Sequence, residues 1–201
     1  MQAVPQAVLQ TGPQPKAKEE LQEWLWECDR GVKNHGEPNT WDVTLVTDMS
    51  YLFCDMKNFN APIDQWNTSE VINMYNMFGG ASSFNQPITM DTSKVTDMRY
   101  MFDGASSFNQ PITMDTSKVT DMCAMFMDAS SFNQSITMDT SKVINMHSMF
   151  QEASSFNQPI NMDTSKVTNM DDMFDSDDKC AMTHPKPSLS KAIFEAVSNC
   201  F

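Results

Sequence analysis

The stretch that decides the fold is F-N-Q-P-I-T-M-D-T-S-K-V-T-D-M-R-Y-M-F-D-G-A-S-S, residues 84–107, because the chain repeats it almost unchanged. The phrase begins again at Phe108, Phe132 and Phe156, and a looser copy begins at Phe59. A repeat of this length is typical of a solenoid, since one short unit cannot bury its own apolar face and must stack on its neighbours. The sequence therefore predicts a repeat domain of about six coils over residues 39–178.

Each repeat unit is predicted to hold a short strand followed by a short helix. In S-K-V-T, residues 93–96, polar and apolar residues alternate, which places Val95 inward and Lys94 and Thr96 outward. In M-R-Y-M-F-D-G-A, residues 98–105, the apolar residues recur at the spacing of one helical face. The expected fold class is an α/β repeat solenoid of short parallel strands and short helices.

One column of the repeat is predicted to cap these helices. The residue before each predicted helix is Asp or Asn, and both offer a side-chain oxygen to the free N–H groups of a helix N-terminus. A calcium site would need a charged residue at most coils, whereas half of this column is neutral, so we favour capping. The predicted N-caps are Asp48, Asn73, Asp97, Asp121, Asn145 and Asn169.

A second column places asparagine directly after the inward phenylalanine of each coil. An asparagine side chain offers both donors and an acceptor, so the column is predicted to bond backbone groups of neighbouring turns. We interpret it as a structural ladder formed by Asn60, Asn85, Asn109, Asn133 and Asn157.

The outward columns of the predicted strands are the candidate binding surface. They form a stripe of Lys94, Lys118, Lys142, Lys166, Thr96, Thr120 and Thr168. Stacked lysines repel one another unless carboxylates or an anionic partner neutralise them. The stripe is therefore either a contact for an acidic partner or glycan, or a solvated salt ladder with Asp91, Asp115, Asp139 and Asp163. Ice binding by the threonines is a weaker alternative, because Ile72 and Ile144 interrupt their column.

The sulfur-containing residues do not indicate a metal site. Methionines share their columns with Trp, Leu and Phe, so they are predicted to fill the core rather than to bind copper. The five cysteines include no C-x-x-C pair, which excludes a zinc ribbon or a thioredoxin motif. The pairs Cys28 with Cys54 and Cys180 with Cys200 are either disulfides of the end regions or reduced, buried thiols. No cofactor or metal is expected.

An enzyme is not expected either. The sequence carries no Ser-His-Asp set, no phosphate-cradling glycine loop and no HExxH motif, and its repeated carboxylates are columns of the scaffold. His147 shares one variable, solvent-facing position with Arg99, Cys123 and Asp171, so we interpret it as incidental.

Charge limits the class of partner. The chain of 201 residues has a formal net charge of -13, which repels nucleic acid and anionic membranes. No run reaches membrane-spanning length, and the N-terminus has no basic region followed by an apolar stretch, so a signal peptide is not predicted. A protein partner is expected, with a glycan as the alternative, and the chain is expected inside the cell if this N-terminus is complete.

Both ends of the array are predicted to be capped. Residues 1–17 form a disordered tail, and residues 18–38 form a helical cap that uses Leu21, Trp24, Leu25 and Cys28. Residues 179–201 contain a predicted helix near residues 188–199, with apolar residues on one face. That helix either folds onto the last coil or binds a partner.

The unit F-N-Q-P-I-x-x-D-T-S-K-V-T-D-M-x-x-M-F-x-x-A-S-S resembles the BspA-type leucine-rich-like repeat, a Mycoplasma-type surface-protein repeat of unknown function. The resemblance runs from about residue 24 to residue 174. It implies a right-handed, leucine-rich-repeat-like coil displayed at the cell surface for adhesion or protein binding. The expected function is thus a non-enzymatic protein-interaction or adhesion module that presents the repeated sheet face. The alternatives are a structural spacer that contacts partners through its caps or edges, and a glycan- or ice-binding surface.

Overall fold

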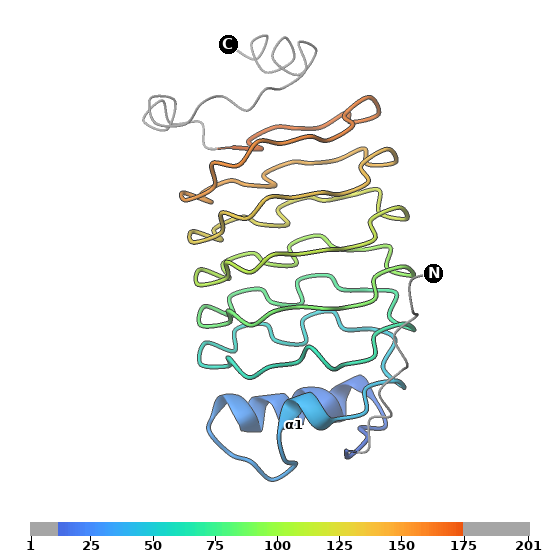
Figure 1. The fold of residues 1–201 in the computed structure, drawn as a ribbon, viewed down its shortest axis with the longest axis vertical. Coiled ribbons are helices and arrows are strands. Elements are labelled where there is room, and N and C mark those ends of the chain that lie inside the picture. Colours follow the sequence, from blue (N-terminus) through green and yellow to red (C-terminus); the bar gives the residue numbers. More distant parts are fainter. Residues whose placement is uncertain (1–11, 175–201) are drawn as a thin grey trace, which may run out of the picture.

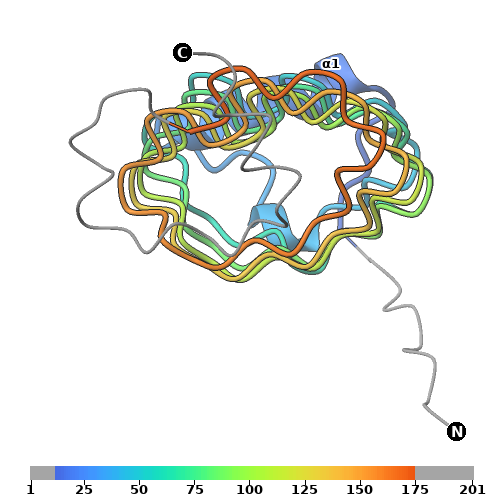
Figure 2. The same ribbon diagram turned by 90° about the horizontal axis from the view of Figure 1, so that it is seen from above.

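The structure, a computed structural model, describes residues 12–174. Over this range the chain winds into a stack of similar coils, with α1 (Lys18–Asp29) at the lower end and the last described coil at the upper end (Figure 1). Seen along the stack, successive coils superpose as one flattened ring (Figure 2). The helices of residues 12–174 are α1 and the single 3-10 turn Pro38–Thr40.

The predicted α/β fold class is wrong. Within the described range the repeats contain no sheet, and the β-pairing between neighbouring coils consists of isolated parallel bridges, among them Asp48 with Asn73 and Asn73 with Asp97. The predicted strand is interrupted because the N–H of Val95 donates to the carbonyl of Thr92, 2.9 Å away, in a tight turn. Only the N–H of Thr96 then reaches the previous coil, at the carbonyl of Ile72, 3.0 Å away. The parallel strands implied by the leucine-rich-like resemblance are therefore reduced to single contacts.

A run of turns replaces the predicted helix of each coil. In the coil that starts at Phe84, the N–H of Met101 donates to Met98 and that of Asp103 to Tyr100, each three residues back. The N–H groups between them point to the next coil, where Phe102 donates to the carbonyl of Met125, 2.9 Å away. Alternate N–H groups donate to the next coil rather than to their own coil. The hydrogen bonds to the residue four positions earlier, which define an α-helix, therefore do not form.

Left-handed backbone makes this alternation possible. Tyr100, with φ 59°, and Gly104, with φ 65°, both adopt it, four residues apart. Equivalent residues of the other coils do the same, including Tyr51, Asp55, Asn76, Gly80, Ala124, Asp128, Ser148, Glu152 and Asp172. A left-handed residue other than glycine costs roughly 1–2 kcal/mol, and the hydrogen bonds between coils offset this cost.

The predicted N-cap residues do not cap helices, because within residues 12–174 no helix follows them. Each side-chain oxygen instead accepts a hydrogen bond from the backbone N–H two residues on, which is an Asx-turn. Oδ1 of Asp97, for example, lies 3.1 Å from the N–H of Arg99. The same bond is present at Asp48, Asn73, Asp121, Asn145 and Asn169.

The core consists of stacked columns of identical side chains. Phe78, Phe102, Phe126 and Phe150 stack with near-parallel rings at centroid distances of 5.4 to 5.5 Å. A second column runs beside it and contacts it within each coil, as at Phe102 and Phe108, 4.4 Å apart. Methionines complete the filling, and Met98, Met122 and Met146 are fully buried. The hydrophobic core therefore lies inside the ring, between coils.

Polar ladders tie the coils together at the surface. Oδ1 of Asn85 accepts the backbone N–H of Asn109 at 3.0 Å, and Oδ1 of Asn109 accepts that of Asn133 at 2.9 Å. Asn60 and Asn157 belong to the same series. A threonine column that the sequence analysis did not single out also bridges the coils, since the buried Thr116 hydroxyl donates to the carbonyl of Asp139 at 2.9 Å.

The N-terminal end of the stack is covered by α1, whose Leu21, Trp24 and Leu25 are buried against the first coil. Part of the predicted disordered tail is ordered: the carbonyl of Pro13 accepts the N–H of Asp42 at 3.1 Å. The remaining tail, residues 1–11, lies outside the described residues, as do the C-terminal region 179–201, its predicted helix and the pair Cys180 and Cys200. Cys28 and Cys54 are free thiols.

Candidate functional site

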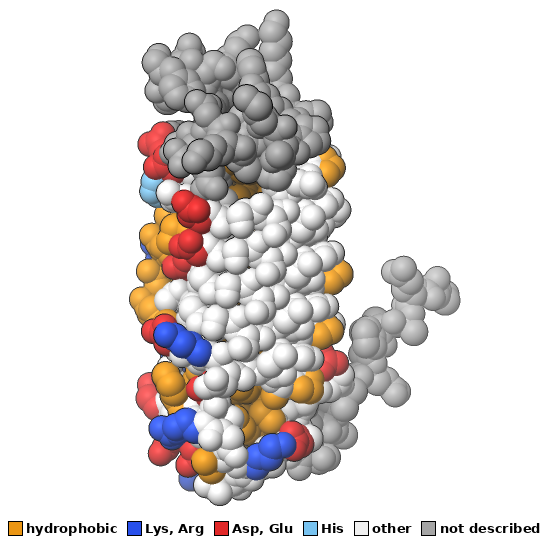
Figure 3. Space-filling view, turned by 90° about the vertical axis from the view of Figure 1, so that its left-hand side faces the viewer, with side chains coloured by type: hydrophobic (Ala, Val, Ile, Leu, Met, Phe, Trp, Pro, Cys, Tyr) orange, Lys and Arg blue, Asp and Glu red, His pale blue; other side chains and the backbone are white. Residues whose placement is uncertain are grey.

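Charged and hydrophobic side chains are unevenly spread over the outside of the stack. On the face shown in Figure 3, uncharged polar side chains and backbone cover the middle, hydrophobic side chains show along both edges, and charged side chains gather along the left edge and at the lower end. Coils that are near copies of one another present the same surface repeatedly, so any specific site must use the positions at which they differ.

The differences are concentrated in the segment of turns. Two adjacent positions read Ser50–Tyr51, Tyr75–Asn76, Arg99–Tyr100, Cys123–Ala124, His147–Ser148 and Asp171–Asp172 along the stack. Two further positions read Cys54–Asp55, Gly79–Gly80, Asp103–Gly104, Met127–Asp128 and Gln151–Glu152. We call the surface formed by these residues the variable face. The inward residues between them stay Met, Leu or Phe, so the variation does not disturb the core.

Three tyrosines of the variable face form a row along the stack. The ring centroids of Tyr51 and Tyr75 lie 5.1 Å apart, and those of Tyr75 and Tyr100 lie 5.6 Å apart. Tyr51 is 45% exposed, which is unusual for a large aromatic side chain. We call Tyr51, Tyr75 and Tyr100 the tyrosine row. Its rings offer apolar faces and polar hydroxyl groups together, the combination enriched in protein-binding surfaces.

Further side chains extend this aromatic surface. The Arg99 guanidinium lies 5.1 Å from the Tyr75 ring centroid and is held by Asp97, 2.6 Å away. At the other end of the row, the Gln22 amide of α1 donates to the carbonyl of Tyr51 at 3.1 Å. Trp26, one helical turn further along α1, is 36% exposed. The capping helix and the first coils therefore contribute to one surface.

An acidic group adjoins the row. Burial, and secondly repulsion by Asp128, raises the pKa of Asp103 to about 6. Burial also raises the pKa of the Cys54 thiol, and the carboxylates of Asp55 and Asp103 add to that increase. The pKa of Tyr100 is raised to about 12, chiefly by its hydrogen-bonded neighbour Cys123. The phenol and the thiol are thus neutral near pH 7, and the carboxylates carry the charge.

Two glycines adjoin this acidic group. A Cβ at Gly79 would collide with the side-chain oxygen of Asn76, and a Cβ at Gly80 would come within 2.8 Å of Oδ1 of Asp55. The Asn76 oxygen is buried and has no hydrogen-bond partner within the described part of the chain. This stretch of the variable face is therefore rich in acceptors.

The predicted lysine and threonine stripe lies on another part of each coil. Lys94 pairs with Glu70 at 2.7 Å, whereas Lys118, Lys142 and Lys166 form no ion pair within residues 12–174. The lysines still act on the aspartates through space, since the pKa of Asp115 is lowered by hydrogen bonds from Ser117 and then by the charges of Lys118 and Lys142. Asp91, Asp115, Asp139 and Asp163 accept the backbone N–H of the serine two residues on. The hydroxyls of Thr96 and Thr168 donate to backbone carbonyls of Ile72 and Ile144, and Thr120 is exposed.

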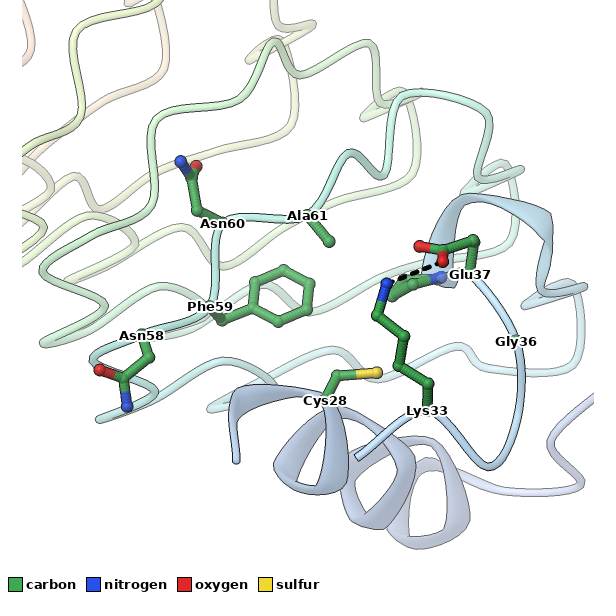
Figure 4. A pocket seen from close by; sticks show the side chains of 9 residues that line it. Cys28, Lys33, Gly36, Glu37, Asn58, Phe59, Asn60 and Ala61 are labelled. Atoms are coloured by element: carbon green, nitrogen blue, oxygen red, sulfur yellow. Dashed lines mark hydrogen bonds and ion pairs between the residues drawn. The ribbon is translucent and has the colours of Figure 1, made fainter. Parts of the chain in front are cut away.

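A small pocket lies between the end of α1, the loop that follows it and the first coil (Figure 4). Its volume is about 120 Å³, and Cys28 and Phe59 line it beside the Lys33–Glu37 ion pair of 2.9 Å. Ligand pockets usually measure about 300 Å³ or more. Burial, followed by the charge of Glu37, raises the pKa of Cys28, so its thiol is protonated and a poor nucleophile. We do not assign a function to this pocket.

Residues 12–174 contain no group of three His, Cys, Asp or Glu side chains placed to hold a metal ion. In the same range, no helix is long and apolar enough to cross a bilayer.

The model of a family described as Mycoplasma protein of unknown function, DUF285, matches residues 21–114 and again residues 113–185. The chain belongs to this family. The two consecutive matches confirm that the DUF285 chain is a tandem repeat. No match was found among curated proteins or among solved structures.

Sequence reasoning missed the tyrosine row because it aligned the coils to find what they share. The signal was present in the differences between coils: one coil has Ser50–Tyr51 where the next has Tyr75–Asn76 and the third has Arg99–Tyr100. That these tyrosines touch follows only from the stacking of the coils.

Proposed function

We propose that this DUF285 chain is a non-enzymatic protein-interaction module that binds its partner through the variable face, with the tyrosine row at the centre. The observation that carries the proposal is the row itself, 5.1 to 5.6 Å from ring to ring, in which Tyr51 is exposed and Tyr75 and Tyr100 are half-buried. Tyrosine, tryptophan and arginine are the residues that most often dominate binding energy in protein interfaces. All three types occur at this surface, as Tyr51, Trp26 and Arg99.

The rigidity of the scaffold supports the same function. The Tyr51 N–H donates to the Tyr75 carbonyl at 2.9 Å, and the Tyr100 N–H donates to the Cys123 carbonyl at 3.0 Å. Because the backbone under the row is fixed before binding, little conformational entropy is lost when a partner docks. The resemblance to the BspA-type repeat supports adhesion at a cell surface as the setting of this interaction.

The lysine stripe is the competing surface, and one experiment separates the two. Affinity capture from a lysate and from the surface fraction of the source cell is run with the wild type, with Tyr51→Ala/Tyr100→Ala and with Lys118→Gln/Lys142→Gln. Each captured protein is then purified, and its dissociation constant for the three chains is measured by calorimetry.

We expect a partner whose affinity falls about 10- to 100-fold with the tyrosine variant, since interface tyrosines are frequent hot spots. The lysine variant is expected to bind as the wild type does. Circular dichroism and melting temperature show whether each variant remains folded. If folded tyrosine variants bind every captured partner with wild-type affinity, the variable face is not the binding surface.

A further inference from the structure

Unneutralised negative charge lies beside the tyrosine row. Asp103 shares a tight turn with Tyr100, because its N–H donates to the Tyr100 carbonyl at 3.0 Å, and its carboxylate contributes to the raised pKa of the phenol. The Gly104 N–H donates to the Met127 carbonyl at 2.8 Å, which brings Asp128 of the next coil beside Asp103, and the two carboxylates repel each other. Neither Asp103 nor Asp128 forms an ion pair within residues 12–174.

The cations of this surface are already occupied. Nη2 of Arg99 lies 2.6 Å from Oδ2 of Asp97, and Nζ of Lys18 lies 3.4 Å from Oδ2 of Asp48. Lys18 also donates to the Ser50 hydroxyl at 2.7 Å. The described part of the variable face therefore presents a net negative potential to a partner.

Hydrogen-bond donors are scarce at the same place. The Asn76 side-chain oxygen is buried without a partner in the described residues, and the Asn76 amide nitrogen is directed to the Cys54 sulfur, 3.6 Å away. Cys54 in turn lies beside Asp55, with 3.9 Å between sulfur and carboxylate oxygen. Acceptors and aromatic rings thus adjoin one another with few donors between them.

The chain itself shows which group suits such a surface. The Arg99 guanidinium lies 5.1 Å from the Tyr75 ring centroid while bonding the Asp97 carboxylate. A planar guanidinium cation can stack on an aromatic ring and form an ion pair with a carboxylate at the same time. Tyr100 with Asp103 is a similar combination one coil further on, and no arginine of residues 12–174 pairs with that carboxylate.

We propose that the variable face binds a basic segment of a partner protein, with an arginine or lysine side chain against Tyr100 and between Asp103 and Asp128. This inference rests on the proposed function and names the chemistry of its partner. A neutral or acidic segment is disfavoured, because docking it would remove two unpaired carboxylates from water without a compensating cation.

The test is a selection from a random peptide library displayed on phage. The library is selected on the immobilised wild-type chain, with Tyr51→Ala/Tyr100→Ala used to remove peptides that bind elsewhere. Recovered peptides are synthesised with their basic residues intact and with each replaced by glutamine. Dissociation constants are measured by fluorescence anisotropy at low and at physiological salt.

Two aspartate variants complete the design. Asp103→Asn/Asp128→Asn removes the acidic group, and Asp115→Asn/Asp139→Asn is the matched control, since it removes the same charge away from the variable face. In the control the asparagine oxygens still accept the serine N–H bonds at 2.9 and 3.0 Å. Long-range electrostatic attraction alone would affect both double variants equally.

We expect the tyrosine-dependent peptides to be enriched in arginine or lysine. Their affinity should fall about tenfold or more for Asp103→Asn/Asp128→Asn and little for the control. Tyrosine-dependent peptides that are no more basic than the library, or that bind both aspartate variants equally, overturn this inference and leave the proposed function standing. The recovery of no tyrosine-dependent peptide overturns both.

Discussion

The rings of Phe78 and Phe102 are parallel to within 2° with centroids 5.4 Å apart, although 24 residues separate them in the chain. The pair shows how this fold is stabilised. A phenylalanine that follows Met101 in one coil meets its equivalent in the next, and such contacts across coils join the ring contacts within each coil, as at Phe102 and Phe108, to build the core.

The first prediction concerns this column. Phe102 contacts Phe78, Phe108 and Phe126, so Phe102→Ala removes three ring contacts and leaves a cavity between coils. We expect a loss of about 3–5 kcal/mol in the free energy of unfolding. Urea denaturation followed by circular dichroism measures it, and the exposed Thr113→Ala serves as a control that changes stability by less than about 0.5 kcal/mol. A loss near the control value would show that the column does not hold the coils together.

The second prediction concerns the left-handed positions, for which Asp171 and Asp172 form a matched pair. Asp172 has φ 52°, whereas Asp171 is exposed and outside the left-handed region. Asp172→Gly is expected to stabilise the chain by about 0.5–1 kcal/mol, because glycine adopts this backbone without strain. Asp171→Gly is expected to destabilise it. Thermal melts of the two variants test this prediction. Equal changes of melting temperature with the same sign would contradict the left-handed backbone at Asp172.

A third prediction tests the asparagine ladder. Oδ1 of Asn109 accepts the backbone N–H of Asn133 at 2.9 Å and the Gln134 amide at 3.0 Å. Asn109→Ala leaves the Asn133 N–H unpaired, whereas the Gln134 amide keeps its bond to the Asn109 backbone carbonyl at 3.1 Å. The substitution is expected to cost about 1–3 kcal/mol. Asn109→Asp keeps the accepting oxygen and should cost less. Amide hydrogen exchange at Asn133 gives a local measure, and exchange that is equally fast in both variants would argue against the ladder.

The fourth prediction is a pH dependence. The pKa of Asp103 is raised to about 6 by burial and by Asp128, so the folded chain binds this proton more tightly than the unfolded chain does. Ionised Asp103 therefore opposes folding above pH 6, and this cost disappears as the pH falls through about 6 toward about 4. Asp103→Asn is expected to raise the melting temperature at pH 7.5 and to have little effect at pH 4.

The control for this prediction is Asp139→Asn. Hydrogen bonds from Ser141 lower the pKa of Asp139, so its ionised form favours folding at neutral pH. The control should not raise the melting temperature at pH 7.5. If Asp103→Asn raises it equally at both pH values, the gain does not come from ionisation.

The sequence predicted which positions of each repeat are buried, but not the secondary structure in which these positions lie. Met98, Met101, Phe102 and Ala105 are all fully buried, as the predicted helical face requires. A run of turns with left-handed residues four positions apart buries the same positions as a helix does. The spacing of the apolar residues alone therefore could not distinguish a run of turns from a helix. The glycines at positions 80 and 104 were the available clue, since both adopt positive φ in the column that elsewhere holds Asp55, Asp128 and Glu152.

By itself, the sequence determined that this chain is a stack of repeats with a methionine and phenylalanine core, because identical units can bury their apolar residues only against each other. Only the tertiary structure decided that the units are joined by hydrogen bonds between turns. A backbone N–H can donate within its own coil or to the next coil, and the second acceptor lies about 24 residues away in the chain. It also decided that Tyr51, Tyr75 and Tyr100 meet. Their different positions within the repeat become adjacent only when the coils are stacked.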